Sequence, residues 1–162
     1  MHDNQVKVGI ADLNLVLPPG VIMTIGLGSC IGIALYDKKL KIAGLAHIML
    51  PDSTQFNNVT TPMKFADLAI PLLIDKMIKM GSNKNNIIAK ISGGASMFNF
   101  SDKSVTSDIG ARNTAAVKEA LKKLNIPILA EETGGNKGRT MIVNSEDGVV
   151  TIRIVGQGTI TL

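Results

Sequence analysis

The chain has 162 residues and a formal net charge of +4, with 45% hydrophobic but only 3% aromatic residues. This length predicts one domain over residues 1–162 with an aliphatic core. The basic residues are scattered and not interleaved with aromatics, so nucleic-acid binding has little support. A single cysteine cannot form an internal disulfide, and we find neither a signal-peptide pattern nor an apolar run of membrane-spanning length. We therefore expect a cytoplasmic protein without membrane insertion.

Apolar runs and turn signals predict several strands in the first third of the chain. The expected elements are one short strand within 7–15, a turn at 18–20, a buried strand within 21–28, and a hairpin of 30–37 and 41–50. The polar segment 51–62 predicts a long loop.

Helical periodicity predicts a helix within 63–81, which Pro71 should kink or restart, and an amphipathic helix within 108–125. Further strands are expected within 85–94, 126–135, 139–145 and 149–156, the last two joined as a hairpin through 146–148. Six or seven strands with two principal helices predict an α+β fold, a layered sandwich of mixed β-sheets flanked by helices.

The only cysteine, Cys30, stands in the stretch "TIGLGSC" after Gly26 and Gly28. Unpaired cysteine is often a small buried hydrophobe, and that interpretation stays open. The glycines permit a bend that could project the thiol from a strand end. Amide N–H groups around Gly28, Ser29 and Cys30 could then face a substrate carbonyl, as an oxyanion site requires. Cys30 is therefore a candidate nucleophile.

The chain has two histidines, and His2 lies near the terminus, so His47 is the candidate general base for Cys30. His47 lies near the end of the next predicted strand, and antiparallel pairing would make the two residues neighbours. Thr24, a hydroxyl in a predicted buried strand, could accept the second ring N–H and fix the tautomer. A core histidine and a threonine bonded to local backbone are the alternatives.

Three other motifs have weaker interpretations. Gly93 and Gly94 could let the chain pass close to the site, or form a plain turn. We interpret Arg112 and Asn113 as helix-capping and surface ion-pair residues. The stretch "EETGGNKGR" at 131–139 is interpreted as a solvated hairpin turn.

An apolar pair in an irregular segment could serve as a contact for a partner. Met97 and Phe98 could meet a partner helix, or they could plug the core. With Gly93 and Gly94, Phe98 is a candidate for the substrate rim.

Five ordered motifs between about residues 21 and 140 resemble the chemoreceptor glutamine deamidases of the CheD family. They are "TIGLGSC", "AGLAHIMLPDS", "GGASMF", "IGARN" and "AEETGGNKGR". The resemblance implies a cysteine-hydrolase sandwich fold shared with certain deamidating bacterial toxins. It also implies catalytic roles for Cys30, His47 and Thr24, in a mechanism without metal or cofactor. For residues 131–139 it favours a structural or substrate-rim role over a solvated turn.

The resemblance implies substrates and a partner as well. The substrates would be glutamine side chains on the cytoplasmic helices of methyl-accepting chemotaxis receptors, which would become glutamate. Hydrolysis of glutamate methyl esters would use the same chemistry. A CheC-type phosphatase would bind the enzyme in competition with the receptors.

Other classes of function fit the residues less well. "GLGSCIG" departs from the dinucleotide-binding spacing and precedes a strand. One cysteine and one usable histidine are too few ligands for zinc. A redox-sensing thiol would lack a resolving cysteine in this chain. A binding module that engages receptors and the phosphatase, with minor catalysis, stays open as the main alternative.

Overall fold

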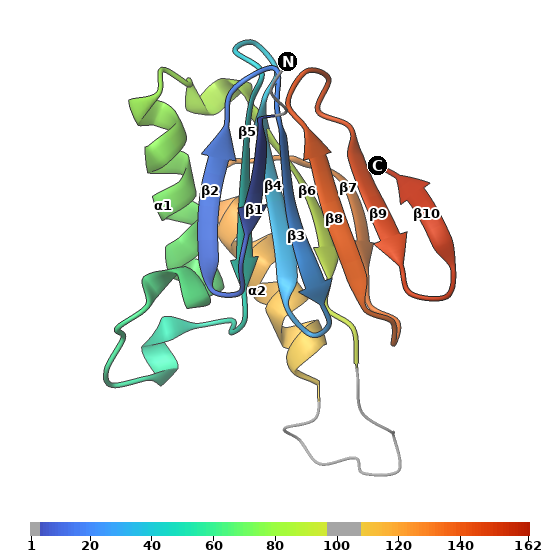
Figure 1. Ribbon diagram of the computed structural model, residues 1–162. Coiled ribbons are helices and arrows are strands. Elements are labelled where there is room, and N and C mark those ends of the chain that lie inside the picture. Colours follow the sequence, from blue (N-terminus) through green and yellow to red (C-terminus); the bar gives the residue numbers. More distant parts are fainter. Residues whose placement is uncertain (1–3, 97–107) are drawn as a thin grey trace.

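The computed structural model describes residues 4–96 and 108–162. Within these residues, ten strands form two five-stranded mixed sheets, and two α-helices cover the outer face of one sheet (Figure 1). The first sheet has the order β1-β3-β8-β9-β10, with bounds Gln5–Val8, Val21–Leu27, Arg139–Asn144, Val150–Ile154 and Gly158–Thr161. The second has the order β2-β5-β4-β6-β7, with bounds Asp12–Val16, Ile42–Ile48, Ile31–Asp37, Ile87–Gly93 and Ile128–Thr133. The predicted α+β sandwich is confirmed.

The strand count exceeds the expected six or seven. Residues 7–15, expected to hold one strand, contain parts of β1 and β2, which a turn at Ile10–Ala11 sends into different sheets. Ala11 adopts φ 60° in that turn. Strand β10 was not predicted, because all four of its residues are exposed and carry no apolar alternation.

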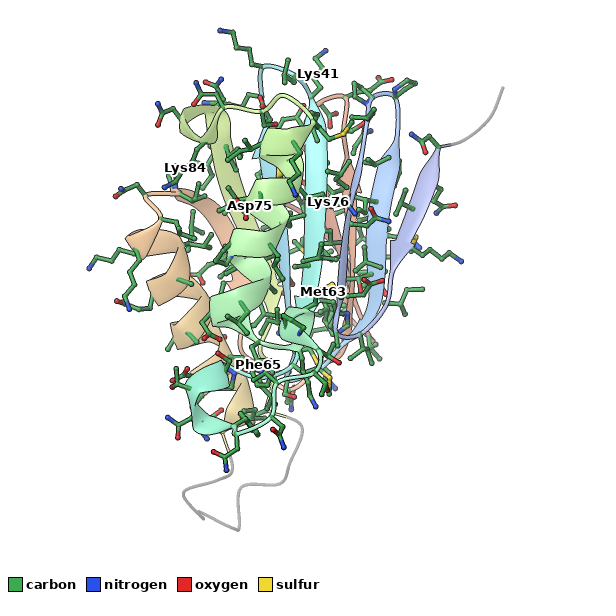
Figure 2. The ribbon with its side chains drawn as sticks, turned by 90° about the vertical axis from the view of Figure 1, so that its left-hand side faces the viewer. Lys41, Met63, Phe65, Asp75, Lys76 and Lys84 are labelled. Atoms are coloured by element: carbon green, nitrogen blue, oxygen red, sulfur yellow. The ribbon has the colours of Figure 1, made fainter. Side chains whose placement is uncertain are left out.

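Helix α1 spans Ala66–Lys79 without a break at Pro71, so the expected new start there is wrong. Proline removes one backbone donor, but Ile70, Leu73 and Ile74 are buried against the sheet. Burial of this face outweighs the missing hydrogen bond. Figure 2 shows α1 from outside, with Asp75 and Lys76 among the side chains of the helix.

Helix α2 spans Ile109–Lys123 and packs beside α1 on the second sheet. Three short 3-10 helices complete the described elements: η1 (Ser53–Gln55), η2 (Pro62–Lys64) and η3 (Lys84–Asn86). The predicted hairpin of β8 and β9 is confirmed, since the two strands pair antiparallel.

The two central strands of the second sheet, β4 and β5, are buried on both faces and therefore belong to two cores. Ile31, Ile33 and Leu35 of β4 pack under the helices. Ala34 and Tyr36 face the other sheet. Because side chains alternate along a strand, Gly32 also belongs to this inter-sheet face. The polar residues of the candidate site lie at one end of this inter-sheet layer.

Candidate active site

Thr24 and His47 meet between the two sheets. Thr24 lies on β3 of the first sheet and His47 on β5 of the second, and both are buried. The Thr24 Oγ1 atom lies 2.6 Å from His47 Nδ1 and donates to the Val8 carbonyl oxygen at 2.7 Å. The predicted hydrogen bond between these two side chains is therefore present in the structure.

The contacts of Thr24 determine the tautomer of His47. A hydroxyl has one proton, and the Val8 carbonyl can only accept, so that proton lies toward Val8. The contact with Nδ1 then requires the ring to donate and Thr24 to accept. Nε2 is left with a free lone pair, and among the described residues it has no hydrogen-bond partner. An imidazole in this state can take up a proton.

Cys30 lies directly before β4, on the face of the sheet that carries His47. Strands β4 and β5 pair antiparallel, with Gly32 opposite His47. Cys30 precedes Gly32 by two residues, which makes it a diagonal neighbour of His47, at a typical spacing of roughly 7–8 Å between backbones. The Cys30 side chain is partly buried and packs against the inter-sheet cluster. The expected neighbourhood of Cys30 and His47 is confirmed by this register.

Burial keeps both groups neutral in the resting state. It lowers the pKa of His47 to about 4 and raises the pKa of the Cys30 thiol, while the Cys30 amide N–H acts on the thiol in the opposite direction. The pair is therefore a neutral thiol beside a neutral imidazole at pH 7. Such a pair suits general-base activation at the moment of attack.

Backbone hydrogen bonds from the residues that follow β6 hold the segment 28–30 in place. Gly94 N–H donates to Cys30 O at 2.9 Å, and Ala95 N–H donates to Gly28 O at 2.8 Å. A Cβ on Gly93, at φ 114°, would lie 2.1 Å from Cys30 O. Only glycine fits there, so the chain does pass close to the site as expected. Gly93 and Gly94 are both buried, and their role at the substrate rim stays a prediction.

Asn113 is not a capping residue, because the cap of α2 is Asp108, whose side chain accepts from Ala111 N–H. Asn113 lies on the buried face of α2 and is fully buried. Its Nδ2 donates to Ser29 O at 3.0 Å and to Met49 O at 2.9 Å. A polar residue on an apolar helix face was the signal for this contact: Asn113 precedes Val117 by four residues.

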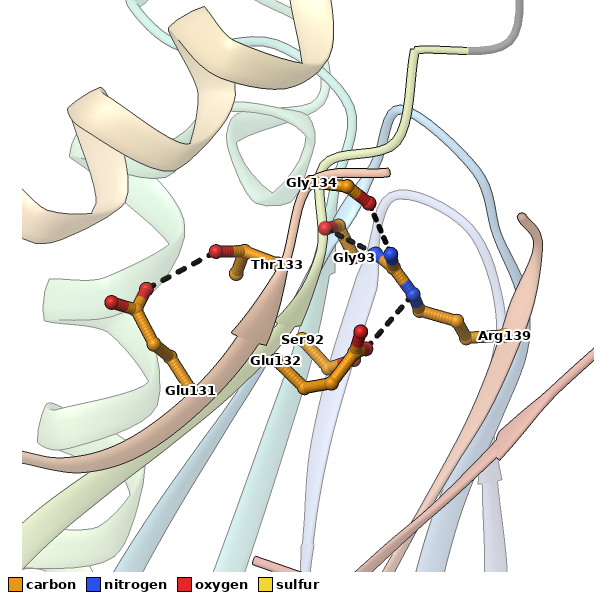
Figure 3. A network of polar contacts seen from close by, with 7 residues as sticks. All are labelled: Ser92, Gly93, Glu131, Glu132, Thr133, Gly134 and Arg139. Atoms are coloured by element: carbon orange, nitrogen blue, oxygen red, sulfur yellow. Dashed lines mark hydrogen bonds and ion pairs between the residues drawn. The ribbon is translucent and has the colours of Figure 1, made fainter. Parts of the chain in front are cut away.

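Arg139 does not belong to a solvated turn. It is 4% exposed and reaches the carbonyls of Gly93 and Gly134 from β8 (Figure 3). Its Nε lies 2.9 Å from Glu132 Oε1, near enough for an ion pair although not aligned as a hydrogen bond. Ser92 donates to the same Glu132 oxygen. Burial lowers the pKa of Arg139 and Glu132 raises it.

Met97 and Phe98 lie outside the described residues. Within residues 4–96 and 108–162, no group of three or more His, Cys, Asp or Glu side chains is placed to hold a metal ion. In the same residues, no helix has the length and apolar character needed to cross a bilayer.

The fold and these contacts describe an α+β sandwich with a thiol, an imidazole and a hydroxyl grouped at one end. A family model described as CheD chemotactic sensory transduction matches residues 49–154. That range begins after Thr24, Cys30 and His47, but full-length relatives cover them. The chain belongs to the CheD family.

Two curated relatives carry the name probable chemoreceptor glutamine deamidase CheD. One, from Clostridium botulinum (strain Alaska E43 / Type E3), is 68% identical over 162 residues, which is 100% of both chains. The other, from Clostridium novyi (strain NT), is 65% identical over 158 residues, 98% of each chain. Among solved structures, Bacillus licheniformis hypothetical protein YfiH has a TM-score of 0.45 and 16% identity, over 82% of this chain and 60% of that chain.

Proposed function

We propose that this chain deamidates glutamine side chains of chemotaxis receptors, with Cys30 as nucleophile, His47 as base and Thr24 as the group that orients His47. One observation carries the mechanism: Thr24 donates to Val8 O, so His47 must present an unprotonated Nε2. The substrate class is supported by full-length relatives named chemoreceptor glutamine deamidase.

The first half of the reaction forms a thioester. His47 Nε2 takes the proton from the Cys30 thiol, and the sulfur attacks the carboxamide carbon of a glutamine side chain. The carbonyl oxygen becomes an oxyanion, which amide N–H groups near Ser29 and Cys30 stabilise. The oxyanion collapses, the C–N bond breaks, and the proton on His47 goes to the nitrogen that leaves as ammonia.

The second half restores the enzyme. His47 takes a proton from water, whose oxygen attacks the thioester carbonyl carbon. The C–S bond breaks, Cys30 recovers its proton from His47, and a glutamate side chain is released. The sum is glutamine plus water to glutamic acid plus ammonia, which ionise to glutamate and ammonium, without oxidation or reduction. A glutamate methyl ester would follow the same steps with methanol as the leaving group.

The proposal extends to partners and location. The substrate segments would be cytoplasmic helices of methyl-accepting receptors, and the enzyme would work in the cytoplasm. A CheC-type phosphatase would compete with the receptors for it. Support for the phosphatase is the family membership alone, and a pull-down with purified CheC-type protein tests it.

The decisive experiment measures ammonia release and glutamine-to-glutamate mass change on a receptor cytoplasmic fragment. Wild type should convert specific glutamines, and Cys30→Ala and Cys30→Ser should show no turnover while remaining folded. Met141→Leu, a volume-conserving change in the apolar cluster against which Cys30 packs, serves as the packing control and should stay active. Measurable deamidation by Cys30→Ala would refute the assignment.

The same variant separates catalysis from an adaptor role. Cys30→Ala should still bind receptor fragments, since it removes one small side chain. In cells, loss of chemotactic adaptation with Cys30→Ala supports the enzyme. A normal phenotype with Cys30→Ala would favour the binding module.

A further inference from the structure

The side-chain amide of Asn113 holds the peptide unit that connects Ser29 to Cys30. Asn113 lies on α2, and its Nδ2 donates two hydrogen bonds, one to the Ser29 carbonyl and one to the Met49 carbonyl. Ser29 directly precedes the proposed nucleophile, and Met49 lies two residues after His47. One buried side chain therefore links the strand ends on which Cys30 and His47 are placed.

Because the peptide between Ser29 and Cys30 is planar, the contact of Asn113 with the Ser29 carbonyl also fixes the direction of the Cys30 N–H. The C=O of Ser29 and the N–H of Cys30 belong to the same planar unit and point to opposite sides. Holding the Ser29 oxygen in the interior therefore turns the Cys30 N–H away from Asn113. The neighbouring carbonyls, of Gly28 and Cys30, are held by backbone N–H groups. Among the described residues, the Ser29 carbonyl is the one in this segment that accepts from a side chain.

In the part of the chain that the structure describes, no carbonyl competes for the Cys30 N–H, which acts on its own thiol. No backbone carbonyl there accepts from the amides of Ser29 or Cys30. An amide next to a nucleophile, directed away from Asn113 and without a carbonyl acceptor among the described residues, has the form of an oxyanion donor. If the Ser29 carbonyl were released, the peptide unit could rotate and put an oxygen where the donor had been.

The side-chain oxygen of Asn113, Oδ1, indicates that this residue does more than stabilise the fold. Oδ1 is buried and has no hydrogen-bond partner among the described residues. Burying an unpaired acceptor is unfavourable, and its helix neighbours on the same face, Val117 and Leu121, are apolar. An aliphatic side chain would avoid this cost but could not bind the two carbonyls.

We propose that Asn113 is a positioning residue that aims the Cys30 N–H at the developing oxyanion by fixing the Ser29 carbonyl. This inference rests on the proposed deamidase function. Since one oxyanion donor commonly contributes ~10²–10³ in rate, Asn113→Ala should lower kcat about 100-fold with KM nearly unchanged. The oxyanion forms only after substrate is bound, which is why the effect falls on kcat.

The test compares Asn113→Ala, the isosteric Asn113→Asp, and Val117→Ala as a control on the same buried helix face. Each variant is assayed for unfolding free energy, kcat and KM on the receptor fragment. Its Cys30 is also alkylated with iodoacetamide across pH, which needs no receptor. Loss of the aimed N–H should raise the pH of half-maximal alkylation by roughly one unit in Asn113→Ala, because a hydrogen bond to the thiolate is lost. The shift in Asn113→Asp should be at least as large, because an ionised carboxylate there also repels the thiolate. Val117→Ala should keep the wild-type kcat and alkylation profile.

The outcomes are distinguishable. Absence of ammonia release by wild type defeats the proposed function, and the alkylation profiles then still decide whether Asn113 aims the Cys30 N–H. Folded Asn113→Ala with kcat within about 3-fold of wild type overturns the inference, as does an equal loss in Val117→Ala. If Asn113→Ala unfolds, Asn113→Asp decides in its place. Unfolding of both while Val117→Ala stays folded would make Asn113 a core residue only.

Discussion

Two polar clusters connect the sheets, and they differ in how completely their atoms are bonded. In one cluster Arg139 donates to two carbonyls and forms an ion pair with Glu132, although its Nε is not aligned for a hydrogen bond, and Ser92 donates to the same carboxylate. In the other, among the described residues, His47 has Thr24 as its hydrogen-bond partner and Nε2 has none. A well-paired buried group can stabilise the fold, whereas an unpaired lone pair costs free energy and is free to react. The first cluster is therefore expected to govern stability and the second to govern rate.

Removing the imidazole should produce the largest effect. His47→Ala should lower kcat by about 10²–10⁴-fold, the usual contribution of a general base. The measurement is single-turnover deamidation of the receptor fragment, with circular dichroism to verify folding. The unfolding free energy should also fall, because the variant leaves a cavity and removes the buried hydrogen bond from Nδ1 to Thr24. A variant that keeps wild-type kcat would remove His47 from the mechanism.

The Arg139 cluster should respond in the opposite way. Arg139→Leu leaves Glu132 without its cation and two buried carbonyls without a donor, and should lower the unfolding free energy by about 3 kcal/mol. Urea unfolding measures this loss. The double variant Arg139→Leu/Glu132→Leu should be less destabilised, since no carboxylate is left unpaired. If Arg139→Leu were instead fully stable but inactive, the contrast between the clusters would be wrong.

The burial of His47 makes stability depend on pH. Its pKa is about 4 in the folded protein against an ordinary value of 6.5, so the unfolded chain binds the proton first as pH falls. The free energy of unfolding is therefore not reduced by protonation of His47 above pH 6.5, and it falls progressively as the pH is lowered toward 4. At pH 5 the loss is about 2 kcal/mol.

The matched comparison for this pH effect is wild type against His47→Leu, each unfolded in urea at pH 7 and pH 5. The decrease in unfolding free energy from pH 7 to pH 5 should be about 2 kcal/mol smaller in the variant, because only wild type carries the titrating ring. Equal decreases in the two proteins would show that His47 does not titrate as buried.

Local sequence was sufficient to predict Cys30 and His47 as neighbours. Cys30 directly precedes β4 and His47 lies on β5; these two strands form a hairpin, so their register follows from a short loop and alternating apolar residues. Thr24 was predictable for a related reason, since a hydroxyl in a buried strand needs a partner. Its second contact, with Val8, depends on the parallel pairing of β1 and β3, which the sequence did not indicate.

Long-range contacts were the part that sequence could not supply. Asn113 meets Ser29 across 84 residues of chain, and Arg139 meets Gly93 across 46. A residue's periodicity shows which face of an element it occupies, but not which carbonyl lies opposite. For this reason Asn113 could be suspected as a buried polar residue, while its contact with Ser29 required the fold. The burial of Arg139 was not predicted, because the glycines and charged residues around it are typical of a solvated turn.

The smallest effect should come from Thr24, and it tests whether orientation can be separated from chemistry. Thr24→Val keeps the shape but cannot accept from Nδ1, so the ring can place its proton on either nitrogen and loses its fixed orientation. We expect kcat to fall roughly 10- to 100-fold, as when outer partners of functional histidines are removed. Thr24→Ser, which keeps the hydroxyl, should retain most activity. Equal losses in Thr24→Val and Thr24→Ser would assign the effect to packing of the methyl group. A loss confined to Thr24→Val would show that one hydroxyl, held by Val8, keeps Nε2 in the basic form.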